Sequence, residues 1–157
     1  MSAAEKKTSK KTASSTSGMS SDERAAMKER AAELRTASRR AKGAAKAEAE
    51  AQDVLDKIAE LPEDDRVLAE RVHAVITAAA PALAPKLWYG MPAYAKEGKI
   101  VCFFQGAAKF GSRYSTLGFN DPASLDDGSM WPTAFAITVV GKAEEKLITE
   151  LITKAVG

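Results

Sequence analysis

Residues 99–104 read Lys-Ile-Val-Cys-Phe-Phe, a nearly unbroken run of β-branched and aromatic side chains. Such a run favours a buried strand, and the Glu97-Gly98 pair before it is typical of a turn. Two further runs, Tyr114–Phe119 and Phe135–Val140, are predicted to be strands as well. A turn-rich segment, Asn120–Ser129, separates the last two runs, and the succession of strands and turns predicts a meandering antiparallel sheet.

Helical patterns lie on both sides of the predicted strands. Apolar side chains recur at helical spacing from Val54 to Leu61, from Val67 to Ala79 and from Leu147 to Val156. Pro62 suits the first position of the middle helix, and Pro81 and Pro85 are expected to stop it. The sequence therefore predicts an α+β fold, in which an antiparallel sheet has helices from both ends packed on one face.

The N-terminal third has a different composition. Only four of the larger apolar residues lie in the first 50 positions, so burial can drive folding only in the second part. We predict a disordered tail over residues 1–20, an exposed charged helical extension over 21–51 that is interrupted at Gly43, and the α+β domain over 52–157. Residues 1–50 carry 12 Lys or Arg against 7 Asp or Glu, whereas the remainder carries 11 against 14.

The composition excludes several classes of protein. A single cysteine, Cys102, rules out an internal disulfide, and no paired Cys or His ligands for zinc are present. No apolar run approaches the roughly 18 residues that span a bilayer, so we expect a soluble cytoplasmic protein. The only histidine, His73, points about 120° away from the apolar stripe of its helix and is predicted to lie on the surface. With no phosphate-binding loop motif either, we expect no enzyme.

Four acidic residues gather where two predicted helices meet. Carboxylates three or four residues apart share a helix face and could hold iron or magnesium weakly. Acids at a helix N-terminus also stabilise the helix without any metal, and the residues alone leave both interpretations open. The predicted metal-binding residues are Glu60, Glu63, Asp64 and Asp65.

The string Trp88-Tyr-Gly-Met-Pro-Ala-Tyr94 predicts a rigid bend that could line an apolar pocket. Alternatively, Trp88 and Met91 simply close the end of the core. Cations among aromatic side chains further along the chain would favour an anionic ligand. The predicted ligand-binding residues are Trp88, Tyr89, Met91, Tyr94, Lys109, Phe110, Arg113, Tyr114 and Trp131.

These residues carry a resemblance to a known family. The Trp88–Tyr94 string is followed in order by Gly98-Lys99, Lys109-Phe110, Thr116–Phe119, Leu125–Gly128 and Trp131–Thr133, and preceded by Val54–Pro62. Over about residues 53–156 this pattern resembles the YdhG-like family of small bacterial domains. The resemblance implies helices flanking an antiparallel sheet, and one branch of the family is described as a frataxin-like intracellular iron chaperone. Frataxins are thought to bind iron through an acidic ridge on the first helix, whose nearest counterpart here is Glu60–Asp65, although no motif aligns these acids one by one.

Three functions stay open at this point. The first is a non-catalytic cytoplasmic iron chaperone, which requires no cofactor and would bind iron transiently. The second is a binding module for a small anionic ligand in the Trp88–Tyr94 pocket. The third is association with nucleic acid through the basic extension, which we expect least because acids are interspersed among its cations. No membrane partner is expected, and the sequence does not indicate an oligomeric state.

Overall fold

The computed structural model describes residues 20–157. They fall into two units, residues 20–42 and Gly43–Gly157, and each is described by itself. The predicted disorder of the tail falls on residues 1–19, outside the described part of the chain. In chain order the elements are α1 (Ser21–Glu60), α2 (Glu63–Ala79), β1 (Ala84–Trp88), β2 (Met91–Lys96), β3 (Lys99–Gln105), η1 (Ala108–Phe110), β4 (Ser115–Phe119), β5 (Ala134–Ile137) and α3 (Lys142–Ala155).

Helix α1 is continuous through Gly43, so the predicted interruption there is wrong. A single glycine costs about 1 kcal/mol relative to alanine in a helix interior. The good helix formers on both sides of Gly43 outweigh that cost. At the start of α1, the Ser20 hydroxyl oxygen accepts a hydrogen bond from the Glu23 N–H at 3.2 Å, which caps the helix.

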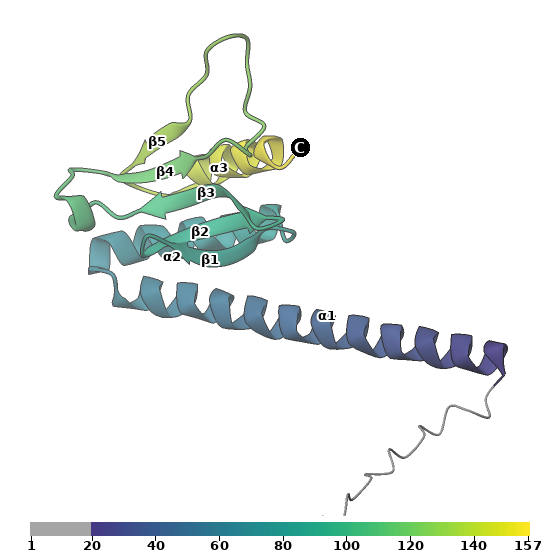
Figure 1. Cartoon of the computed structure of the whole chain (residues 1–157). Coiled ribbons are helices and arrows are strands. Elements are labelled where there is room, and N and C mark those ends of the chain that lie inside the picture. Colours follow the sequence, from purple (N-terminus) through teal and green to yellow (C-terminus); the bar gives the residue numbers. More distant parts are fainter. Residues whose placement is uncertain (1–19) are drawn as a thin grey trace, which may run out of the picture. The chain divides into compact units, whose positions relative to one another are not determined.

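The five strands form one antiparallel sheet in the order β1-β2-β3-β4-β5 (Figure 1). Each strand pairs with its neighbour in sequence, which confirms the α+β class and the meander. The predicted Glu97-Gly98 turn is also confirmed, because these two residues join β2 to β3 with φ values of 52° and 79°. The last strand is shorter than expected and ends at Ile137.

The predicted bend at Trp88–Tyr94 is instead a hairpin of two strands, which the sequence analysis missed. Tyr89 and Gly90 form its two-residue loop, with φ values of 50° and 73°. Positive φ at both loop residues is the geometry that matches the twist of the flanking strands. Pro85 does not prevent β1 from forming, because β1 lies at the edge of the sheet, where a strand tolerates proline.

The core lies between one face of the sheet and the helices. Helices α2 and α3 pack there together with Val54 and Ile58, which come from the last turns of α1. Successive side chains of a strand point to opposite faces of the sheet, so every second residue of a strand faces these helices. The fully buried side chains on the two sides include Val54, Val72, Ile76 and Ile152 from the helices and Tyr94, Cys102, Phe104 and Leu117 from the sheet.

The other face of the sheet carries a small aromatic contact. The rings of Trp88 and Phe103 lie 5.1 Å apart between centroids, and the Phe103 ring covers Gly118 on the neighbouring strand. A Cβ atom at Gly118 would lie 2.2 Å from Phe103 Cζ. The close approach of the ring therefore requires glycine at this position.

Across residues 20–157, no helix combines the length and the apolar character that a membrane span requires.

Candidate functional site

An open groove of about 970 Å³ lies between the N-terminal part of α2, the segment from Ala107 to Ser115, and the segment that follows β5. Its volume is at the upper end of the range for small-molecule sites, about 300–1,000 Å³. Buried Leu68, Ile137 and Val140 contribute apolar surface to it. The groove draws its lining from three separate stretches of sequence, so only the fold brings it together.

Asp65, in the first turn of α2, is only 5% exposed. Its carboxylate holds one wall of the groove in place. Its Oδ2 accepts a hydrogen bond from the Ala108 N–H at 3.0 Å, and its Oδ1 accepts one from the Ser115 hydroxyl at 3.3 Å. The Ser115 oxygen in turn accepts the Ala107 N–H at 3.1 Å. These bonds tie α2 to both ends of the connection between β3 and β4. Gly106 lies so close that a Cβ there would be 2.9 Å from Asp65 Oδ2.

Two arginines line the groove, and they differ in their partners. Arg71 donates through Nη1 to the Val140 carbonyl at 3.2 Å and lies 3.9 Å from Glu145 Oε1. Arg113 has no ion-pair partner within residues 20–157, and its Cζ lies 5.3 Å from the centroid of the Tyr114 ring. A guanidinium that stacks on an aromatic ring keeps its N–H groups available for a carboxylate or phosphate. Arg113 is therefore the groove's available anion-binding group.

Some apolar side chains that line the same groove as Arg113 are exposed to solvent. Val67 is 42% exposed, Tyr114 38% and Val139 63%, and all three line the groove. Val67 was predicted to lie on the buried stripe of its helix, but it faces the groove instead. Together they add apolar surface to the groove that Arg113 also lines.

The four acidic residues of the predicted metal site are not equivalent. Glu60 is the last residue of α1, is exposed, and does not line the groove. Glu63 and Asp64 are exposed in the first turn of α2 and do line it. Both carboxylate oxygens of Asp65 already accept hydrogen bonds. Within the described part of the chain, no group of three or more His, Cys, Asp or Glu side chains is placed to hold a metal ion.

The predicted ligand-binding residues separate into several places. Trp88 and Met91 pair across the hairpin, and Tyr89 in its loop is 79% exposed. Lys109 in η1 donates a hydrogen bond through Nζ to the Tyr89 carbonyl and lies over the ring of Phe110. These five residues therefore gather around the hairpin loop and η1.

The remaining four predicted ligand-binding residues lie elsewhere. Arg113 and Tyr114 line the groove, together with Glu63 and Asp64 from the predicted metal site. Tyr94 is fully buried among the helix-facing residues of the sheet. Trp131 is half-buried and packs against the core. Trp88 and Tyr94, which were predicted to line one pocket, thus lie on the two faces of the sheet.

His73 is not on the surface as predicted, but half-buried against the sheet. Its Nδ1 lies 2.8 Å from the Tyr94 hydroxyl oxygen, and the two rings are 5.7 Å apart. The position of His73 around the helix axis predicted exposure wrongly, because the long Tyr94 side chain reaches the side of α2 on which His73 lies. Burial lowers the pKa of His73, and it raises the pKa of Tyr94 and of Cys102, the latter to about 12.

The sequence analysis did not single out Arg71 or Val139, although both line the groove. Arg71 follows Val67 by one helical turn, which is a signal that the two share a face. Nothing local indicates that this face meets the residues after β5, because that contact is made only in the folded domain.

Comparison of the chain with models of protein families, with curated protein sequences and with solved structures gives no match in any of the three.

Proposed function

We propose that residues 43–157 form a non-catalytic binding domain that holds a small organic anion in the groove. The observation that carries this proposal is the state of Arg113. Its guanidinium lines the groove, lies over Tyr114, and has no ion-pair partner among the residues described. An arginine so placed favours a carboxylate or a phosphate, which it can bind through two parallel hydrogen bonds.

The rest of the lining suggests what such a ligand looks like. Val67, Tyr114 and Val139 expose apolar surface that suits an aromatic or aliphatic body. Glu63 and Asp64 add negative charge to the same groove, and like charges repel. These features together favour a ligand with a single anionic group and an apolar body over a polyanion.

A non-catalytic role is supported by where the reactive side chains lie. The chain has one histidine and one cysteine, and neither lines the groove. His73 contacts Tyr94, and Cys102 is a buried thiol whose raised pKa keeps it protonated. A buried protonated thiol is a poor nucleophile.

Calorimetric titration of the full chain with benzoate, phenyl phosphate and benzylamine tests the proposal. The three probes share an aromatic body and differ in charge. We expect the two anions to bind and benzylamine not to bind. Arg113→Gln should weaken binding of the anions by about tenfold or more, because a hydrogen bond to a charged group is worth about 1.5–3 kcal/mol.

The matched control is Arg39→Gln, which removes the same charge from an exposed position in the extension. It should leave the affinity for benzoate unchanged. Binding of benzylamine in preference to both anions, or equal losses from the two arginine variants, would count against the proposal.

Transient iron binding is a second candidate, as the family resemblance implies. The observation in its favour is that Glu63 and Asp64 are adjacent, exposed, and line the groove. Carboxylate oxygens are suitable ligands for a hard cation. Because Asp65 is engaged in hydrogen bonds, such a site would rest on two carboxylates and would be weak.

Anaerobic titration with ferrous iron separates this candidate from the first. If iron binds here, Glu63→Gln with Asp64→Asn should abolish saturable binding. The same change in charge at Asp126 and Asp127, two adjacent exposed acids in the loop before β5, should not. Equal iron binding by both double variants would exclude the site.

A further inference from the structure

Five basic side chains lie along one face of the helix within residues 21–42. At about 100° per residue, they fall within an arc of about 60° and extend over about 27 Å of the helix axis. All five are exposed. We call this set the basic stripe; it consists of Arg24, Lys28, Arg35, Arg39 and Lys42.

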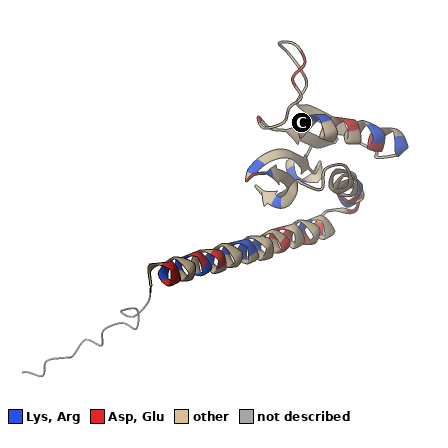
Figure 2. Ribbon diagram, turned by 90° about the vertical axis from the view of Figure 1, so that its right-hand side faces the viewer, with Lys and Arg blue, Asp and Glu red and all other residues tan. Residues whose placement is uncertain are grey.

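The acidic residues of the same unit lie on other faces of the helix. Measured around the axis from Arg24, they fall between about 140° and 260°. Acids that are interspersed with cations in the sequence are therefore separated from them in space. These residues are Asp22, Glu23, Glu29 and Glu33, and Figure 2 colours both signs of charge along the helix.

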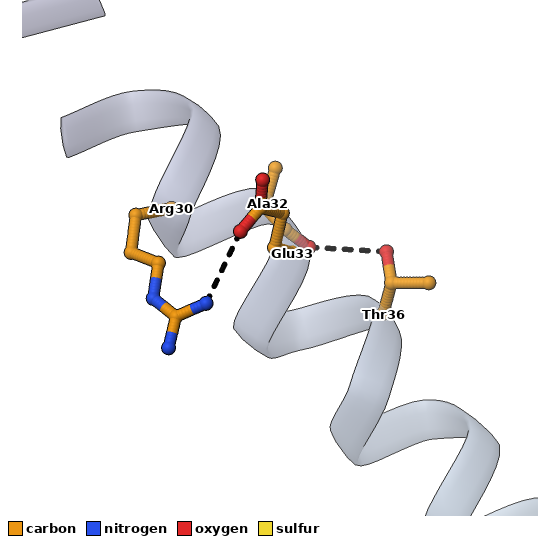
Figure 3. A network of polar contacts seen from close by, with 4 residues as sticks. All are labelled: Arg30, Ala32, Glu33 and Thr36. Carbon is orange, nitrogen blue, oxygen red and sulfur yellow. Dashed lines mark hydrogen bonds and ion pairs between the residues drawn. The ribbon is translucent and has the colours of Figure 1, made fainter. Parts of the chain in front are cut away.

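The ion pair between Arg30 and Glu33 lies away from the stripe. Arg30 Nη1 is 3.2 Å from Glu33 Oε2 (Figure 3). In the next turn, the Thr36 hydroxyl donates a hydrogen bond to the Ala32 carbonyl. Lys28, Arg39 and Lys42 form no ion pair with any residue from 20 to 157. The same holds for Arg35, whose Nε donates to the neutral carbonyl of Ala31 at 3.3 Å. These four cations of the stripe therefore keep their positive charge.

We propose that the basic stripe binds the phosphate backbone of a nucleic-acid duplex without reading its sequence. A straight row of Lys and Arg about 27 Å long can contact several phosphates at once, and each contact releases counterions. An anionic membrane surface is the less suitable partner. Surface-bound helices bury a broad apolar face, whereas the large apolar side chains here are only Met27 and Leu34, and the first 50 residues contain no aromatic residue.

The expected salt dependence gives the test its quantity. If Lys28, Arg35, Arg39 and Lys42 each contact one phosphate, these four contacts contribute about −3.6 to the slope of the logarithm of the association constant against the logarithm of salt concentration. This contribution corresponds to a loss of affinity of about 150-fold between about 50 and 200 mM salt. Fluorescence anisotropy of the full chain with a labelled DNA duplex of arbitrary sequence measures that slope.

Two double variants with the same change in charge separate the stripe from general attraction. Arg35→Gln with Arg39→Gln removes two cations from the stripe, and Arg30→Gln with Arg40→Gln removes two from other faces of the same helix. The stripe variant should lower the magnitude of the slope by about 1.8, and the control should leave it unchanged. Residues 1–19 are the same in every variant, so their lysines add equally to each slope.

Binding measurements with other partners identify the kind of partner that the stripe prefers. A duplex RNA of the same length should bind with the same difference between variants, because the backbone charge is shared. Equal slopes for the two double variants, or no binding to either duplex at low salt, would overturn the proposal. So would binding to vesicles of phosphatidylcholine and phosphatidylserine in the absence of duplex binding. Circular dichroism at 222 nm should show that both variants keep the helix content of the wild type.

Discussion

Replacing Asp65 with alanine should destabilise the domain far more than the same change at its neighbour Asp64. Asp65 is buried and accepts hydrogen bonds from the Ala108 N–H and the Ser115 hydroxyl, whereas Asp64 is exposed. Both lie in the first turn of α2, so both lose the same favourable interaction with the helix dipole, about 0.3–1 kcal/mol. The comparison thus isolates the hydrogen bonds.

The magnitude follows from those two bonds. A hydrogen bond to a charged group contributes about 1.5–3 kcal/mol, and alanine leaves both donors without a partner. The buried carboxylate also carries a desolvation cost that alanine does not, which offsets part of the loss. We therefore expect Asp65→Ala to lower the free energy of unfolding by about 2–4 kcal/mol, and Asp64→Ala by less than about 1 kcal/mol.

Urea unfolding followed by tryptophan fluorescence measures both variants, because Trp88 and Trp131 are half-buried in the domain. Adding Ser115→Ala completes a double-mutant cycle, which should show a coupling of about 0.5–3 kcal/mol with Asp65. Hydrogen exchange at the Ala108 amide should accelerate in Asp65→Ala and not in Asp64→Ala. If the two aspartate variants were equally stable, the hydrogen-bond network would not hold the groove wall as described.

Three further predictions concern the core. Gly118→Ala should cost about 1–3 kcal/mol in urea unfolding because its Cβ would lie 2.2 Å from Phe103 Cζ, and the cost should nearly vanish in a Phe103→Leu background; an equal cost in both would contradict this packing. Burial lowers the pKa of His73 below 6.5, so the folded state binds fewer protons than the unfolded state, and the melting temperature should fall as pH drops from 6.5 toward the lowered value. His73→Gln should flatten the dependence of the melting temperature on pH. A melting temperature of the wild type that does not change with pH would contradict the lowered pKa of His73. Cys102, with a pKa raised to about 12, should resist a thiol-specific disulfide reagent at mildly alkaline pH until urea unfolds the chain, whereas rapid labelling of the native protein would show that the thiol is accessible.

Much of the domain could be predicted from local pattern. The run at residues 99–104 became β3, and the apolar periodicities after Pro62 and around Leu147 became α2 and α3. These segments could be predicted because the spacing of their apolar residues matches the face that each segment buries. The strand order then follows because strands that are consecutive in sequence usually lie next to each other in a sheet.

The first hairpin escaped prediction for two physical reasons. Pro85 normally excludes a strand, but an edge strand leaves some of its N–H groups unpaired and can include proline. Tyr89 takes a positive φ, which is unusual for a residue other than glycine, so the string did not show the usual signal of a two-residue turn.

The groove was predicted only in fragments. Glu63, Asp64, Arg113 and Tyr114 were singled out, but as parts of two different sites. Asp65 looked like its acidic neighbours because burial and hydrogen bonds at that position depend on Ser115, which is 50 residues away. Sequence spacing along α2 could not reveal that contact.

The most direct test of the groove as the binding site is a two-dimensional NMR titration of the full chain with benzoate. The largest changes in amide chemical shift should fall on Ser112–Ser115 and on Val139–Gly141, which both line the groove. Changes centred on Trp88–Met91 would place the ligand at the hairpin loop and contradict the role given to Arg113.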